Sequence, residues 1–375
     1  MKILAIETSC DETAASVVVD GSLVLSDIIS SQIETHTVYG GVIPELAARE
    51  HIRNISWVVD SAIKEAGIDK SELDAIAVTN HPGLIPALAV GVAFAKGLAM
   101  SLDIPFLGVN HFLGHIYGAF LEQPELLNQQ ETYPILALVA SGGHTAIVII
   151  ESTGEAKIVG QSIDDAAGEA YDKAAKLLKL GYPGGPVIDR LAQEGNPHAY
   201  ALPRALTGAN GKPVKPELKY CFSFSGVKTA LLYTIHRLLK EKGVDPKTVS
   251  PEEEAELISE HEAKDLAASF QEAVVDVLVS KSTKAAKDFK VKTALICGGV
   301  ACNSALRSRF SKAMKDRKIN PVIAPAKYCT DNAAMIGGLA FHYAKNGSFS
   351  SLDIDVLSRA RTMPNMPFTP QSKEK

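Results

Sequence analysis

The chain has 375 residues, of which 46% are hydrophobic and 22% are charged, and its formal net charge at pH 7 is −5. This length predicts two domains, the composition excludes a disordered chain, and the acidic balance gives no overall nucleic-acid signature. The 5 cysteines form no CxxC pair, which indicates reduced thiols rather than a disulfide scaffold.

The apolar stretches of the chain favour a soluble protein over a membrane protein. The N-terminal run is interrupted early by Glu7, so we expect no signal peptide. The longest apolar stretch, Ile85 to Met100, contains Lys96 and two glycines, which favours a buried helix over a membrane span. We therefore expect a cytoplasmic protein with no membrane partner.

A strand, a tight turn and a second strand occur twice. Residues 3–14 read ILAIETSCDETA and residues 135–146 read ILALVASGGHTA, so that Ile, Leu, Ala, Ser, Thr and Ala recur in register. The alternative is that two apolar hairpins resemble each other by chance. The repeat predicts a duplicated α/β unit.

The elements after each hairpin follow the same order. In the first half we expect strands over 23–29, 73–79 and 105–109, helices over 44–66 and 86–102, and then a helix that carries His111 and His115. In the second half we expect strands over 157–161, 293–297 and 321–324, helices over 168–180, 185–194, 225–241, 303–314 and 332–344, and a helix that begins at 250–253. Hairpin strands followed by alternating helices and strands predict two α/β domains with a cleft between them.

The domain boundaries are expected in the linking segments. We place the N-terminal domain at 1–125 and the C-terminal domain at 132–345, with a helical insertion at about 163–265. The tail over 358–375 is rich in Pro, Met and Ser, and we expect it to be loosely ordered.

Two histidines one helical turn apart suggest a metal site. His111 and His115 are spaced i, i+4, which places both imidazoles on one helix face, although such pairs also arise by accident. Phe112 follows His111, so the HExxH pattern of metalloproteases is absent. Asp331 offers a third, oxygen ligand. Two imidazoles and a carboxylate suit zinc and ferrous iron alike.

Four turns at element junctions suit an anionic ligand. Glycines in 141–145, 181–186 and 297–300 let backbone N–H groups approach an anion, whereas 9–13 offers hydroxyls and carboxylates. Each turn alone is commonly only a turn, but together they favour a nucleotide or acyl-phosphate site. Asp172 lies in the expected helix that begins at 168, and Asp189 follows the 181–186 turn. Each can bind a ribose or substrate hydroxyl or belong to a solvated helix face.

Two further segments have two interpretations each. Phe222–Gly226 reads FSFSG; it can form a substrate wall, but we favour core packing with Ser223 or Ser225 capping the next helix. The segment 281–318 is rich in Lys and Arg, which fits either a polyanion surface or solvated helix faces.

The ordered motifs of the chain resemble those of the TsaD family, the tRNA threonylcarbamoyladenosine synthases of the actin-like, sugar-kinase and Hsp70 (ASKHA) superfamily. The resemblance extends from Ile3 to about Tyr343 and is strongest to the bacterial branch. It rests on the segments ETSCDET (7–13), YGGVIPELA (39–47), the His111/His115 helix, SGGHT (141–145), GEAYDK (168–173), FSFSG (222–226), GGVACN (298–303) and CTDNAA (329–334).

The resemblance implies two actin-like, RNase H-like domains and a metal-dependent acyltransferase. The implied reaction moves the threonylcarbamoyl group of threonylcarbamoyl-AMP to the adenosine 3′ of the anticodon in ANN-decoding tRNAs. One divalent metal ion, with Fe²⁺ preferred and Zn²⁺ as the alternative, is implied at His111, His115 and Asp331. The implied contacts to the acyl-adenylate are Val139, Ala140, Ser141, Gly142, Gly143, Asp172, Gly185, Asp189 and Asn303. For proton transfer from the amine we select Asp11 or Glu12.

The resemblance also implies protein partners, namely a TsaB-like paralogue in a heterodimer and a TsaE-like ATPase, besides tRNA. The chain departs from the family pattern at His81 and Pro86, where glycine is expected, which leaves the shape of that loop open. Three other functions compete: a metalloprotease, which lacks its glutamate here; an ATP-dependent small-molecule kinase of the same fold, which has no use for the histidine pair; and a non-catalytic paralogue, which is expected to lack that pair and Asp331.

Overall fold

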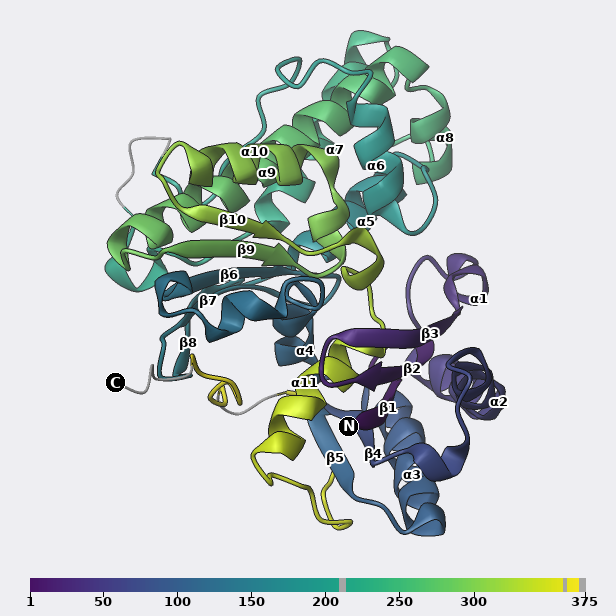
Figure 1. Ribbon diagram of the computed structural model, residues 1–375. Helices are drawn as coiled ribbons and strands as arrows, with labels where there is room; N and C mark the ends of the chain where they lie inside the picture. Colours follow the sequence, from purple (N-terminus) through teal and green to yellow (C-terminus); the bar gives the residue numbers. More distant parts are fainter. Residues whose placement is uncertain (209–213, 360–362, 371–375) are drawn as a thin grey trace. The chain divides into compact units, whose positions relative to one another are not determined.

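The computed structural model describes residues 1–208, 214–359 and 363–370, and these residues form two compact units. Unit 1 comprises Met1–Tyr133, Ile150–Lys157 and Ala324–Lys375, and unit 2 comprises Pro134–Ile149 and Ile158–Ile323. Each unit is built around one five-stranded sheet, and the two sheets have equivalent strand orders, β3-β2-β1-β4-β5 and β10-β9-β6-β7-β8. The equivalence confirms the α/β fold expected from the repeat (Figure 1).

Unit 1 is formed by the first part of the chain and by one helix near the C-terminus. Its strands are β1 (Lys2–Glu7), β2 (Glu12–Val19), β3 (Leu23–Ser31), β4 (Ala75–His81) and β5 (Phe106–Asn110), and its helices are α1 (Ile33–Thr37), α2 (Pro44–Glu65), α3 (Ile85–Leu102), α4 (His111–Gly118) and α11 (Ala334–Lys345). Strands β1, β2 and β3 pair antiparallel, whereas β1, β4 and β5 run parallel. The parallel strands therefore direct Glu7, His81 and Asn110 toward one edge of the sheet.

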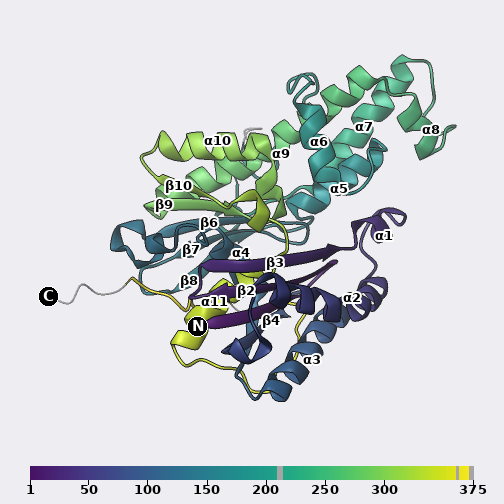
Figure 2. The same cartoon turned by 45° about the vertical axis from the view of Figure 1, so that its right-hand side comes forward.

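Successive side chains of β1 point to opposite faces of this sheet. Leu4 and Ile6 join a buried cluster with side chains of α2 and α3, which cover one face (Figure 2). Ala5 points to the other face, where a Cβ on Gly337 of α11 would lie 3.1 Å from its Cβ. The small residue thus allows α11 to pack closely on the strands.

The packing of α11 corrects the expected domain boundary. We predicted 132–345 as the second domain, but α11 contacts β1, β2, β4, β5 and α4 and belongs to unit 1. Contiguous boundaries from sequence fail here because the chain returns to the first unit after β10. The tail prediction is also wrong in part: Met366 and Phe368 are 4% exposed, although 360–362 and 371–375 lie outside the described residues.

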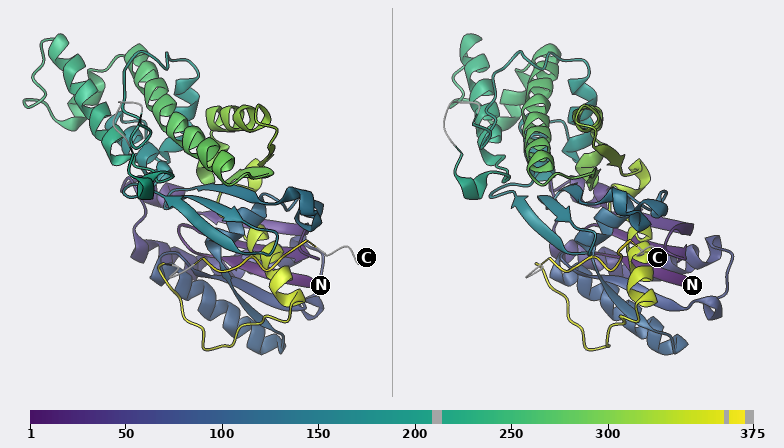
Figure 3. Two further views of the ribbon diagram at one scale, coloured as in Figure 1. Left: turned by 90° about the vertical axis from the view of Figure 1, so that its left-hand side faces the viewer. Right: turned by 60° about the vertical axis from the view of Figure 1, so that its left-hand side comes forward.

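Unit 2 repeats the architecture with a larger helical part. Its strands are β6 (Ile135–Ala140), β7 (Thr145–Ile150), β8 (Ala156–Gln161), β9 (Thr293–Cys297) and β10 (Asn320–Ile323), and its helices are α5 (Ala167–Leu177), α6 (Gly184–Ala192), α7 (Ser225–Glu241), α8 (Pro251–Glu256), α9 (Glu260–Asp288) and α10 (Ser304–Lys315). The long helix α9 packs on β6, α6, α7 and α10 (Figure 3). Because β6 and β9 are parallel, the turns after both strands lie at the same sheet edge.

Most predicted elements are confirmed within a few residues, and two were missed. Ser250 caps α8 by accepting from the backbone N–H of Glu253, as its capping signal indicated. Helix α9 was missed because it is buried on most of its circumference, which removes the apolar period of an amphipathic helix. The second missed element is the short helix α1, which has no side-chain cap to mark its start. One described helix, α3, is apolar and long enough to cross a membrane; it packs against β4 and α2.

Candidate functional site

The histidine pair lies at the start of α4, where β5 ends at the edge of the unit 1 sheet. Asn110 is both the last residue of β5 and the N-cap of α4, and its Oδ1 accepts from the N–H of Leu113 at 3.0 Å. This cap starts the helix at His111, so that His111 and His115 occupy its first and second turns. Both side chains are buried, at 6% and 1% exposure. The Asn110 cap thus fixes the start of α4 and so places the imidazoles of His111 and His115 near the end of β5.

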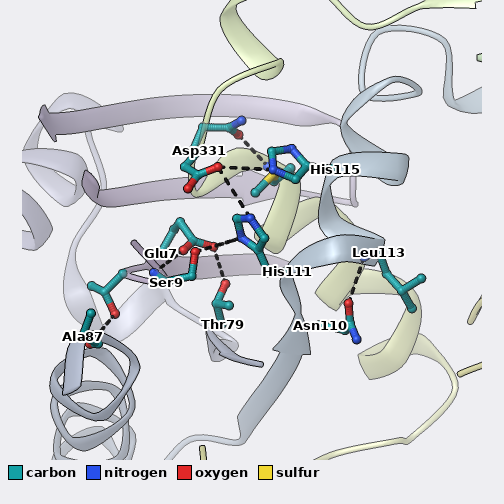
Figure 4. A network of polar contacts seen from close by, with 12 residues as sticks. Glu7, Ser9, Thr79, Ala87, Asn110, His111, Leu113, His115 and Asp331 are labelled. Atoms are coloured by element: carbon teal, nitrogen blue, oxygen red, sulfur yellow. Dashed lines mark hydrogen bonds and ion pairs between the residues drawn. The ribbon is translucent and has the colours of Figure 1, made fainter. Parts of the chain in front are cut away.

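Asp331 reaches the same place from the segment before α11. Its Oδ1 atom lies 3.5 Å from Nε2 of His111 and 3.2 Å from Nε2 of His115 (Figure 4). The next residue, Asn332, fixes the turn because its Oδ1 accepts from the N–H of Met335. The structure therefore brings together the three predicted metal ligands, although Asp331 follows the two histidines by more than 200 residues in sequence.

These three residues fit a divalent cation. One ligand atom from each lies within 4.8 Å of the others. Metal–ligand bonds of about 2.0–2.1 Å at tetrahedral angles separate neighbouring ligand atoms by about 3.3 Å, close to the 3.2 and 3.5 Å between Asp331 and the imidazoles. Both ring nitrogens of His115 are buried and make no hydrogen bond of acceptable geometry, although Nε2 lies close to Asp331. This Nε2 atom could therefore coordinate a bound cation.

Glu7 supports His111 from the end of β1. Its Oε2 atom lies 3.0 Å from Nδ1 of His111, while its carboxylate accepts from the N–H of Ser9 and the hydroxyl of Thr79. Such a carboxylate holds the ring so that Nε2 faces a metal. This role of Glu7 was not predicted, although a carboxylate that ends an apolar strand is a signal of it.

The charges of the cluster match this assignment. Burial lowers the pKa of His111, but Glu7 and Asp331 outweigh burial and raise this pKa to about 9. Burial raises the pKa of Glu7, and His111 opposes it, so that the Glu7 pKa lies below its ordinary value. His111 is thus a cation between two carboxylates when no metal is bound. Metal binding releases that proton, because a ligand imidazole must be neutral.

The predicted proton acceptors lie beside this cluster. Glu12 begins β2 and Asp11 is 7% exposed. Burial raises the pKa of Glu12 well above its ordinary value, and the neighbouring Asp11 and Asp331 raise it further. The turn is held from α2, where Nε2 of His51 lies 3.0 Å from the carbonyl oxygen of Cys10. The Glu12 carboxylate therefore interacts with Asp331, a candidate metal ligand, and with Asp11.

The loop with His81 and Pro86 fits the site without glycine at either position. The His81 ring hydrogen-bonds Asn80 at 2.7 Å, and Pro86 lies in the first turn of α3, where no helical N–H donor is needed. Gly83 is the residue that the packing requires, since a Cβ there would lie 2.6 Å from the carbonyl oxygen of Ser9. The departures from the family pattern leave the contact with Ser9 intact.

The predicted nucleotide residues form a second group, in unit 2. Val139 and Ala140 are the buried end of β6, and the turn after them is closed by the N–H of Ser141 donating to the carbonyl of His144 at 2.8 Å. Added Cβ atoms on Gly142 and Gly143 would meet nothing within 4 Å. The N–H of Gly168 donates to the carbonyl oxygen of Ser141. The turn therefore presents open backbone.

Asp172 of α5 contacts the start of α6, where Gly185 lies. The Oδ1 atom of Asp172 accepts from the N–H of Gly184 at 2.7 Å, so this carboxylate holds the helix terminus. A Cβ on Gly184 would lie 2.6 Å from the carbonyl oxygen of Tyr171, whereas a Cβ on Gly185 would meet nothing within 4 Å. Of the two glycines, only Gly185 thus faces open space.

Asp189 and Asn303 are joined in one hydrogen-bond network. Asp189 accepts from the N–H and hydroxyl of Ser304 at 3.0 and 2.8 Å, and Asn303 caps α10 by accepting from the N–H of Leu306. Gln271 of α9 contacts both residues. Gln271, which was not predicted, thus links these two predicted residues.

The two phenylalanines of the FSFSG segment are core, as we favoured, but the serines do not act as we expected. Phe222 and Phe224 are buried and stacked, with ring centroids 6.0 Å apart. Ser223 and Ser225 do not cap α7; their hydroxyls donate to Asp164, which also accepts from the N–H of Phe224. The cap comes from a residue remote in sequence, which local capping rules do not reveal.

Comparison with known proteins shows the family to which the chain is similar. Residues 23–338 match the family model TsaD, described as tRNA N6-adenosine threonylcarbamoyltransferase. Proteins of that name from Kosmotoga olearia and Thermomicrobium roseum are 44% and 46% identical, and each alignment covers 95% of this chain and 98% and 95%, respectively, of the relative. The protein of that name from Halalkalibacterium halodurans is 45% identical over 353 residues, 94% of each chain.

Solved structures share the fold at low identity. HypF from T. kodakarensis superposes with a TM-score of 0.56 at 14% identity, covering 92% of this chain and 48% of that one. Full-length HypF in a phosphate- and nucleotide-bound form gives 0.55 at 13% identity, covering 93% and 47%. These two likenesses concern the fold alone. Sequence identity over nearly the whole length decides the family: the chain belongs to the TsaD family of tRNA N6-adenosine threonylcarbamoyltransferases.

Proposed function

We propose that the protein transfers the threonylcarbamoyl group of threonylcarbamoyl-AMP to the N6 amine of the adenosine 3′ of the anticodon in ANN-decoding tRNAs. The observation that carries the proposal is the 44–46% identity to transferases of that name over nearly the whole chain. The grouping of His111, His115 and Asp331 supports it. Since tRNA is the acceptor, we place the protein in the cytoplasm.

In the proposed reaction, the amine nitrogen attacks the carbamoyl carbonyl carbon. The bond from that carbon to the phosphate oxygen breaks, AMP leaves with the electron pair, and the amine loses one proton. A metal ion held by His111, His115 and Asp331, Fe²⁺ in preference to Zn²⁺, would polarise the carbonyl and attract the anionic adenylate. We assign the proton to Asp11 or Glu12, the acidic side chains beside these ligands.

The residues of unit 2 bind and orient the adenylate in this proposal. The Val139–Gly143 turn offers open backbone to the phosphate, whose charge grows as AMP departs. Asp172 holds the start of α6 so that Gly185 leaves room for the ligand. Asp189 and Asn303 supply polar groups for the nucleoside. Each of these roles follows from the family's ligand contacts mapped onto this chain.

Three partners complete the proposed system. A TsaB-like paralogue would form a heterodimer with this chain, and a TsaE-like ATPase would act with the pair. A separate enzyme must supply the adenylate, because a mixed anhydride with AMP has to be made from an activated nucleotide. Copurification of this chain with each recombinant partner, analysed by size-exclusion chromatography, tests the first two assignments.

The deciding experiment is a transfer assay. The purified protein is incubated with labelled threonylcarbamoyl-AMP, unmodified tRNA and its TsaB- and TsaE-like partners, and the digested tRNA nucleosides are separated by chromatography. We expect label on adenosine, lost in His111→Ala/His115→Ala. The matched control, His198→Ala/His261→Ala, removes two exposed histidines and should retain transfer. Full transfer by the first double variant would refute the metal role.

The same assay separates the proposed function from its rival. Absence of label in the presence of competent partners and bound metal would contradict transfer to tRNA. A phosphorylated small molecule formed from labelled ATP would then identify a kinase of the same fold.

A further inference from the structure

Helix α9 carries a buried glutamine, Gln271. Gln271 is 5% exposed, and the nearby Phe270 and Ala273 are 0% and 1% exposed. A buried side-chain amide costs free energy unless its donor and acceptor are both satisfied. The position therefore calls for a specific set of partners.

Both ends of the Gln271 amide have such partners. Its Nε2 donates to Oδ1 of Asp189 at 3.1 Å, and its Oε1 accepts from Nδ2 of Asn303 at 2.5 Å. A carboxylate only accepts, and the amide nitrogen of asparagine only donates. The two contacts thus leave one orientation for the glutamine amide.

The remaining atoms of the two partners are also engaged. Asp189 accepts from the N–H and hydroxyl of Ser304. Oδ1 of Asn303 accepts from the N–H of Leu306, and its Nδ2 lies 3.4 Å from the hydroxyl of Tyr171. Asp189 comes from α6 and Asn303 precedes α10, and both helices pack on α9. Gln271 is the side chain that links the two from the helix between them.

We propose that Gln271 is a positioning residue of the nucleotide site, which fixes the side chains of Asp189 and Asn303 before the adenylate binds. This inference rests on the proposed function in so far as Asp189 and Asn303 contact the nucleotide. Preorganisation of this kind improves affinity because the free protein has already ordered the contacting groups. Gln271 itself acts through its two neighbours.

The residue type is specific to the network. Methionine has a similar size but leaves Nδ2 of Asn303 without its glutamine acceptor and removes one donor from Asp189. Glutamate keeps the acceptor toward Asn303 but places a second carboxylate against Asp189, and like charges at this distance repel. Both substitutions therefore disturb the two side chains without adding bulk.

The test measures binding of AMP to the full-length protein by isothermal titration calorimetry. We expect AMP affinity to fall about tenfold in Gln271→Met and by more in Gln271→Glu, in the range for unpaired buried polar groups. The matched control is Gln193→Met, which removes an exposed glutamine whose Nε2 lies 3.4 Å from the hydroxyl of Ser304. The AMP affinity of this variant should stay within about twofold of that of the parent.

Thermal unfolding with and without AMP separates positioning from general stability. A purely structural role would lower the melting temperature of Gln271→Met while leaving the increase caused by AMP unchanged. We expect that increase to shrink. If Gln271→Met does not fold, the nearly isosteric Gln271→Glu provides the same comparison. Unchanged AMP affinity in the folded variants would overturn the inference.

The transfer assay distinguishes this inference from the proposed function. AMP binding that depends on Gln271 without transfer to tRNA would support the positioning role and contradict the transferase. Transfer by the parent with a raised KM for the adenylate in Gln271→Met would support both. A parent protein that binds no AMP would overturn the inference, whatever the transfer assay shows.

Discussion

Oε2 of Glu7 lies 3.0 Å from Nδ1 of His111, although 104 residues separate the two in sequence. The carboxylate ends β1, the imidazole starts the helix after β5, and the parallel strands bring both to one sheet edge. With Nδ1 engaged by Glu7, Nε2 of His111 is the nitrogen that faces Asp331. The buried end of the first strand therefore orients a candidate metal ligand.

Replacing this carboxylate should weaken metal binding. We expect Glu7→Gln to lower the affinity for Zn²⁺ or Fe²⁺ by about 10- to 100-fold, because carboxylates that orient ligand histidines have effects of this size. Competition with a chromophoric chelator measures the affinity. The control variant Glu72→Gln removes an exposed glutamate that pairs with Lys2. It should leave the metal affinity unchanged. Equal affinities in both variants would contradict the orienting role.

Two adjacent glycines of α6 should respond differently to a methyl group. Gly185→Ala should keep the free energy of unfolding within about 1 kcal/mol, because its Cβ meets nothing within 4 Å. AMP affinity should nevertheless fall at least about tenfold if the adenylate occupies that space. Gly184→Ala should destabilise the protein by about 1–3 kcal/mol, since its Cβ lies 2.6 Å from the carbonyl oxygen of Tyr171.

Chemical denaturation and calorimetry check this pair of variants. A Gly185→Ala protein that binds AMP like the parent would remove Gly185 from the proposed nucleotide site. A Gly184→Ala protein of unchanged stability would show that α6 shifts to accept the methyl group.

The sequence allowed prediction of the hairpins, the parallel strands and the ligand residues, because apolar periods and motifs are local. His111, His115 and Asp331 were assigned through a helical spacing and the family resemblance. Glu7 and Gln271 were missed because their roles depend on which segments the fold brings together. Helix α11 was assigned to the wrong unit for the same reason: its partners lie more than 200 residues earlier.

Loss of the Asp164 carboxylate should destabilise the start of α7. Asp164 accepts from two serine hydroxyls and the N–H of Phe224, so we expect Asp164→Ala to lower the free energy of unfolding by about 1–2 kcal/mol, as for other helix caps. Asp165→Ala removes the ion pair with Lys173 and should cost less than about 1 kcal/mol. Circular dichroism during urea unfolding measures both. Equal losses of unfolding free energy in the two variants would contradict the role of Asp164 at the start of α7.

The stability of unit 1 should depend on His342 at mildly acidic pH. The Nε2 atom of His342 lies 2.9 Å from the hydroxyl of Tyr117, and its ring contacts Phe368. Burial, and to a smaller extent Lys345, lowers the His342 pKa from 6.5 to about 4. Between these two values the unfolded chain binds a proton that folded His342 does not bind. This group therefore makes stability fall as the pH decreases from 6.5 to 4.

Removing the imidazole should reduce that dependence. We expect His342→Gln to flatten the dependence of the unfolding free energy on pH between 6.5 and 4.5, by at most about 1.4 kcal/mol per pH unit, the value for one proton. The fluorescence of Trp57, the single tryptophan, reports on unit 1. His198→Gln removes an exposed histidine and should leave the slope as it is. An unchanged slope in His342→Gln would show that His342 takes up its proton equally in the folded and unfolded chain, contrary to its burial against Tyr117 and Phe368.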